Sequence, residues 1–179
     1  MKIYEQALIL DTILENWHAV LGDDYAAYAN HCYRVLNFSL ALSEESAETI
    51  TKISIAVAFH DLGIWANNTY DYLGPSKQLA REYLAKSTQE GWGEEIEAMI
   101  EQHHKLRKYK AKPSWLVEPF RKADWIDVSR GKLNFGFPSA FAAEVLSKFP
   151  NAGFHKRLIS LTVQRLKTHP FSPLPMMRL

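Results

Sequence analysis

The chain has 179 residues, of which 47% are apolar and 23% are charged, and its formal net charge at pH 7 is +1. This balance is that of an ordinary globular protein, and it excludes a disordered chain. A net charge so close to zero gives no electrostatic basis for binding nucleic acid or an anionic membrane surface. The single cysteine, Cys32, excludes an internal disulfide framework and a multi-cysteine metal site.

The length predicts a single domain over residues 1–179. The N-terminal segment does not resemble a signal peptide, because Glu5, Asp11 and Glu15 interrupt its apolar residues. No stretch approaches the roughly 20 uninterrupted apolar residues of a membrane span. Together with the free thiol, these features predict a cytoplasmic protein without a membrane partner. The sequence leaves the oligomeric state open, a homo-oligomer included.

Helical periodicity dominates the chain, and no alternating run indicates a strand. Helices are predicted over about residues 2–20, 24–42, 44–61, 75–91, 94–106, 113–131, 138–149 and 153–168. Ser43 is the expected N-cap of the helix over 44–61, and Pro119 is expected to kink or divide the helix over 113–131. We therefore predict an all-α fold, a bundle of about seven to nine helices.

Polar residues interrupt the apolar faces of three predicted helices. His31 and Asp124 each lie in line with apolar residues at helical spacing, and His60 and Asp61 end an apolar helix. A carboxylate on an apolar face needs a partner, because an unpaired buried charge is costly. Taken singly, each residue has a structural explanation, such as a hydrogen-bonded core histidine. Together they form a set of two imidazoles and two carboxylates that suits a divalent metal ion.

These residues resemble the H…HD…D signature of the HD-domain metal-dependent phosphohydrolase superfamily. His31 begins HCYRVLNFSLAL, His60 and Asp61 lie in AVAFHDLGIW, and Asp124 lies in FRKADWIDVSRG. PSKQLAREYL and IEQHH also look like stretches of the family, and the resemblance covers about residues 25–130. It implies an HD-like helical bundle in which these four residues bind one divalent ion, with Mn, Co, Fe, Ni, Zn and Mg as the candidates.

The sequence departs from the family pattern in ways that bear on the metal and the substrate. Members with two metals have two further, well-separated histidines between HD and the last Asp, but here only the adjacent His103 and His104 lie there. One ion is therefore expected. Neighbouring residues on a helix point about 100° apart, so one histidine is expected to face the site, and the apolar face favours His103. Ile64 stands where some members have a glutamate, which leaves the general base and the substrate unassigned.

The resemblance implies hydrolysis of a phosphate ester or anhydride in a small, nucleotide-like substrate, by a water that the ion activates. Asp61 would bind the ion and orient the water, and His103 or His104 would donate to the phosphoryl group or the leaving oxygen. Arg34 would neutralise phosphate charge together with His104, or else form a structural salt bridge. Asp127 would hold a ligand histidine, or else lie exposed near a helix end.

Two other functions remain open from the sequence. The first is a non-catalytic module that binds a metal or a nucleotide, which tight binding without turnover would reveal. The second is an HD-fold oxygenase with two irons, which iron analysis and oxygen consumption would reveal. The shortage of separated histidines counts against the oxygenase.

Overall fold

The computed structural model describes residues 1–177, and this part of the chain is helical with no β-strand. Its α-helices are α1 (Leu8–Asn16), α2 (His18–Leu21), α3 (Tyr25–Ala41), α4 (Ala47–Phe59), α5 (Gly63–Ala66), α6 (Leu73–Leu84), α7 (Gly93–Gln102), α8 (Val117–Val128), α9 (Ser139–Lys148) and α10 (Phe154–Thr168). Helices α2 and α5 have 4 residues each, and the other eight have at least 9. The predicted all-α bundle of seven to nine helices is confirmed for the described residues.

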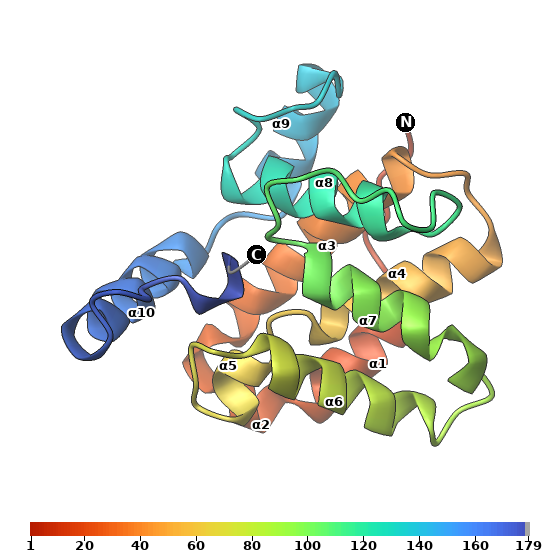
Figure 1. Ribbon diagram of the computed structural model, residues 1–179. Helices are drawn as coiled ribbons and strands as arrows, with labels where there is room; N and C mark the ends of the chain where they lie inside the picture. Colours follow the sequence, from red (N-terminus) through yellow and green to blue (C-terminus); the bar gives the residue numbers. More distant parts are fainter. Residues whose placement is uncertain (178–179) are drawn as a thin grey trace.

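Helix α3 is the central element of the bundle. Every residue from His31 to Leu40 is buried, because α3 packs against both α4 and α8. Helix α7 packs in turn against α4, α6 and α8. Helix α10 and the C-terminal tail lie to one side of these helices (Figure 1), and α10 contacts α3. The centre of the molecule is therefore formed by α3, α4, α7 and α8, the elements that carry or adjoin all of the expected site residues.

Two helix starts differ from the sequence prediction. The N-cap of α4 is Ser46, whose hydroxyl accepts a hydrogen bond from the Thr49 backbone N–H (3.0 Å), whereas Ser43 donates to the Ser39 carbonyl (2.8 Å). Pro119 does not divide a helix, because α8 begins at Val117 and the proline lies in its first turn. A first-turn residue needs no backbone N–H donor, so proline is tolerated there.

The N-terminal segment is less helical than the periodicity indicates. The first predicted helix begins at Leu8, because both backbone groups of Tyr4 bond to the buried Asn37 side chain (2.7 and 3.0 Å) and not to a helical turn. Residues 169–177, the described part of the tail, are irregular apart from a 3-10 turn, Pro175–Met177. No helix within residues 1–177 combines the length and apolar character that crossing a bilayer requires.

Gly63 is needed where α5 meets α6. A Cβ at this position would lie 2.8 Å from the Tyr72 carbonyl oxygen and 3.0 Å from the Ser76 backbone nitrogen, so the two segments would have to separate. We expect Gly63→Ala to lower the free energy of unfolding by about 1–3 kcal/mol, as overpacking typically does. Thermal unfolding tests this, with Gly74→Ala as the control, because a Cβ at Gly74 meets nothing within 4 Å. Equal stability of the two variants would contradict the steric argument.

Candidate metal centre

The four expected ligands converge on one point in the interior. His31 comes from α3, His60 and Asp61 follow the end of α4, and Asp124 comes from α8. His31 Nε2 lies 2.9 Å from His60 Nε2, 3.6 Å from Asp61 Oδ2 and 3.8 Å from Asp124 Oδ1. The same two carboxylate oxygens lie 3.6 and 3.9 Å from His60 Nε2. All four side chains are buried, so they face one another and not solvent.

The rings of His60 and His103 are oriented by the helices that they end. Each is a C-cap residue, and each has its Nδ1 near the carbonyl oxygen three residues earlier, 2.7 Å from Val57 O and 2.6 Å from Ile100 O. A carbonyl oxygen only accepts, so Nδ1 carries the proton and donates it. Nε2 of each ring is then left to face the centre, where Nε2 of a neutral ring such as His60 is unprotonated, as in metal-binding histidines.

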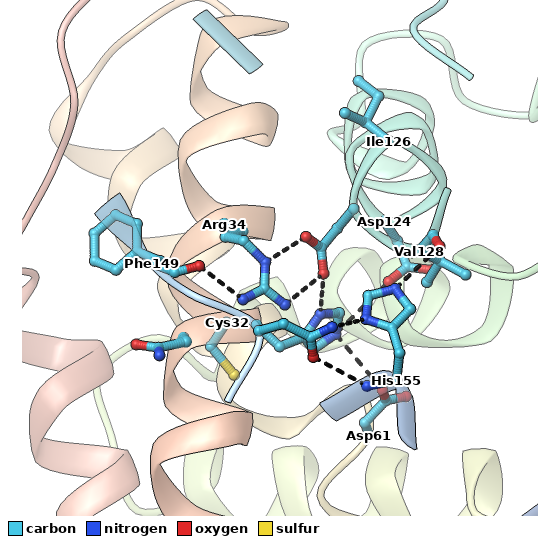
Figure 2. A network of polar contacts seen from close by, with 12 residues as sticks. Cys32, Arg34, Asp61, Asp124, Ile126, Val128, Phe149 and His155 are labelled. Atoms are coloured by element: carbon cyan, nitrogen blue, oxygen red, sulfur yellow. Dashed lines mark hydrogen bonds and ion pairs between the residues drawn. The ribbon is translucent and has the colours of Figure 1, made fainter. Parts of the chain in front are cut away.

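His31 is held from α8 by a buried ion pair. Its Nδ1 lies 2.6 Å from Asp127 Oδ2, and the same carboxylate accepts hydrogen bonds from the Arg34 guanidinium, one of them 3.0 Å long. Arg34 also donates to the backbone carbonyl of Phe149 (3.0 Å), as Figure 2 shows. Burial raises the pKa of Asp127, but His31 and Arg34 outweigh it and lower that pKa to about 2. Asp127 is therefore a charged, buried anchor for His31.

This ion pair changes the role expected of Arg34. The side chain is buried and directed to Asp127 and to the connection between α9 and α10, where it reaches the carbonyls of Phe149 and Pro150. We therefore propose that Arg34 positions Asp127 and, through it, His31, in place of the phosphate contact expected from the sequence. This is the salt bridge that the sequence left as the alternative.

Both adjacent histidines face the centre, so the expectation that only one would do so is wrong. His103 Nε2 lies 3.3 Å from Asp61 Oδ1, and His104 Nδ1 lies 3.3 Å from Asp124 Oδ2. Helix α7 ends at Gln102, and the chain turns at these two residues. The angle of about 100° expected between neighbouring side chains of a continuous helix therefore does not apply to them. Tyr72, to which the sequence assigned no role, also reaches this site, because its hydroxyl lies 2.7 Å from His104 Nε2.

The donor set fits a divalent cation. Asp61 Oδ1, His103 Nε2 and both oxygens of Asp124 are buried and have no hydrogen-bond partner within residues 1–177. Unpaired buried carboxylate oxygens are costly, and a cation is the partner that would offset this cost. Two groups of donors lie within 4.8 Å of one another, His31 with His60 and Asp61, and Asp61 with His103 and His104. Imidazole and carboxylate together suit Mn, Fe, Co, Ni and Zn.

Burial sets the protonation of the centre. It lowers the pKa of His60 to about 3, so this imidazole is neutral and able to bind a metal at pH 7. Burial raises the pKa of Asp61, but His60 and His103 outweigh it and hold that pKa well below its ordinary value. Burial raises the pKa of Asp124 to about 7, because the nearby imidazoles only partly offset the loss of water. Without a cation, Asp124 is thus the ligand that most readily takes up a proton.

We expect the metal affinity to fall as the pH is lowered through 7. Asp124, with a pKa of about 7 in the metal-free protein, must lose its proton to bind a cation, so affinity should drop about tenfold per pH unit below 7. Calorimetry with Mn²⁺ should record release of about one proton at pH 6 and little release from Asp124 at pH 8. An affinity that does not change between pH 6 and pH 8 would contradict this assignment.

Comparison with known protein families supports the interpretation of the signature. A family model of the HD domain matches residues 28–129, which is more than half of the chain and includes all four converging residues. The chain therefore belongs to the HD-domain family, whose members are generally hydrolases that bind divalent metal ions. Searches among curated proteins and among solved structures found no match.

Proposed function

We propose that this protein is a metal-dependent phosphohydrolase that acts on a small phosphate ester or anhydride, such as a nucleotide. His31, His60, Asp61 and Asp124 hold one divalent ion in this proposal. The observation that carries it is the convergence of these buried donors on one point, with carboxylate oxygens that have no hydrogen-bond partner among the described residues. Membership of the HD-domain family supports the same reaction class.

The residues around the ion can move a proton and hold the substrate. When bound, the ion supplies a water of lowered pKa and polarises a phosphoryl oxygen. Burial lowers the pKa of His103, but its contact with Asp61 and the charge of Asp124 raise it above the ordinary histidine value. His103 can therefore hold a proton at Nε2, beside Asp61 Oδ1, and donate it to the leaving oxygen. Burial keeps the pKa of His104 well below 6.5, so its ring, held by Tyr72, is neutral and serves to bind the phosphoryl group.

A substrate screen tests the proposal directly. Nucleotides and simpler phosphoesters are incubated with the purified protein and Mn, Co, Mg, Ni or Zn, and released phosphate or phosphorylated product is measured. We expect release with at least one metal and its loss after chelation. Release that a chelator does not affect would contradict the proposal, because the nucleophile would then not depend on the ion.

Metal analysis of the same preparations separates this function from the alternatives. We expect one ion per chain. Two ions per chain would make His103 and His104 ligands of the second ion, because they lie 3.3 Å from Asp61 Oδ1 and Asp124 Oδ2, respectively. That result would exclude both histidines from proton transfer and substrate binding. Two irons with oxygen uptake would indicate an oxygenase. Tight nucleotide binding without turnover, whichever of these metals is added, would indicate a non-catalytic module.

A further inference from the structure

A cavity of about 310 Å³ adjoins the candidate metal centre. Its wall includes Tyr72 and His104 beside the centre, Trp125 of α8, Ile159 of α10 and Met176 of the tail. The side chain of His104 is 17% exposed, whereas those of His31, His60, Asp61, His103 and Asp124 are at most 3% exposed. The centre therefore meets accessible space at His104, and that space is this cavity.

The wall of the cavity is mainly apolar. Among residues 1–177, neither lysine nor arginine lines it. Two of its polar side chains bond to each other, Tyr70 to Thr162 at 2.8 Å, and His155 Nε2 donates to the Val128 carbonyl at 3.1 Å. The wall thus offers few free partners for sugar hydroxyls, and no described cation for a chain of phosphates. Polyanionic ligands are ordinarily held by arginine and lysine.

We propose that this cavity binds the organic part of the substrate, and that this part is an apolar group of one or two aromatic rings bearing a single phosphate. The inference rests on the proposed function, because the candidate centre would hold the phosphate. A dry cavity of about 150 Å³ holds a benzene molecule, so 310 Å³ accommodates one or two rings. Trp125 presents an aromatic surface against which a ring can pack.

A binding experiment tests the cavity without requiring turnover. Calorimetry compares the binding of 1-naphthylphosphonate and methylphosphonate to the metal-loaded full chain. Both compounds carry the same anionic group. Neither contains a phosphate ester bond, so ester hydrolysis cannot consume them. We expect the naphthyl compound to bind at least about tenfold more tightly, which corresponds to 1.4 kcal/mol. Equal affinities would overturn the proposal.

Two variants on α10 locate the binding. Ile159 lines the cavity yet is 65% exposed, so Ile159→Asp should leave the fold intact. Val163 is 48% exposed on the same helix and lies outside the cavity wall, so Val163→Asp is the matched control. We expect Ile159→Asp to weaken binding of naphthylphosphonate about tenfold and to leave methylphosphonate unchanged, while Val163→Asp changes neither. Equal losses in both variants would indicate a contact made by the exposed face of α10 and would overturn the assignment.

Hydrolysis assays then distinguish this inference from the proposed function. 1-Naphthyl phosphate, glycerol phosphate and a nucleoside triphosphate are compared at equal concentration, and the naphthyl ester is expected to have the highest kcat/KM. Preferential binding of naphthylphosphonate without release of phosphate from any ester would support the cavity and contradict the hydrolase. Preferential hydrolysis of the triphosphate, without preference for naphthylphosphonate, would support the hydrolase and contradict the cavity.

Discussion

Asp124→Asn should remove most of the bound metal and nearly all activity. Both oxygens of Asp124 are buried without a hydrogen-bond partner within the described residues, and Oδ1 lies 3.8 and 3.9 Å from the Nε2 atoms of His31 and His60. An amide at this position keeps the shape but lacks the charge that balances a divalent cation in a low-dielectric site. The loss of metal affinity should be larger than the loss of about 10–100-fold that is typical when the changed residue only supports a ligand.

The same change should not destabilise the metal-free protein. Burial raises the pKa of Asp124 to about 7 in the folded state, above the 3.8 of an ordinary aspartate, so its ionised form is disfavoured on folding. The contribution of Asp124 to wild-type stability should therefore decline as the pH rises from about 4 to 7, and Asp124→Asn should lack this pH-dependent contribution. Above pH 7 the variant should gain stability, by about 1–4 kcal/mol at most. Melting temperatures at pH 5 and pH 8, with and without chelator, provide the measurement.

Asp127→Asn is the matched comparison, one helical turn away on α8. Asp127 touches His31 and Arg34 and none of the other candidate ligands, so the variant should keep a metal site with affinity about 10–100-fold lower. Unlike Asp124→Asn, it should destabilise the metal-free protein, because it leaves the buried Arg34 charge without its counter-ion. If Asp127→Asn loses the metal and Asp124→Asn retains it, the ligand assignment must move by one turn.

Most of the helical framework could be predicted from the sequence because it depends on local patterns. Apolar residues at helical spacing located α3, α4, α7 and α8, and the same spacing placed His31 and Asp124 on inward faces. The predictions that were wrong concern ends of helices. The angle of about 100° between neighbouring side chains holds only within a continuous helix. Helix α7 ends just before His103 and His104, so both side chains reach the centre.

The partners of the candidate ligands could be foreseen only in part, because they depend on tertiary packing. Asp127 is separated from His31 by 96 positions, and Tyr72 from His104 by 32. The sequence offered a choice between an exposed Asp127 and one that supports a histidine, and between a substrate-binding Arg34 and a salt bridge. Packing of α8 against α3 brings these groups together, and periodicity within one helix carries no information about that contact.

Arg34→Met should be the most destabilising of the charge-removing substitutions. The methionine fills similar space but leaves the fully buried Asp127 carboxylate with His31 alone, and it frees the carbonyls of Phe149 and Pro150. Removing one partner of a buried ion pair typically costs about 3–5 kcal/mol. The pKa of Asp127, about 2 in the wild type, should rise, so the stability deficit should be largest near neutral pH and should shrink as the pH falls.

The double variant Arg34→Met/Asp127→Asn distinguishes this electrostatic cause from lost packing. If the unpaired charge is responsible, removing it as well should restore stability relative to Arg34→Met, with a coupling of about 1–3 kcal/mol in urea denaturation. If the two losses simply add, Arg34 acts by packing and not through Asp127. Metal affinity gives an independent readout, because Arg34 reaches the centre only through Asp127 and His31. Arg34→Met should therefore weaken metal binding about 10–100-fold without removing a ligand.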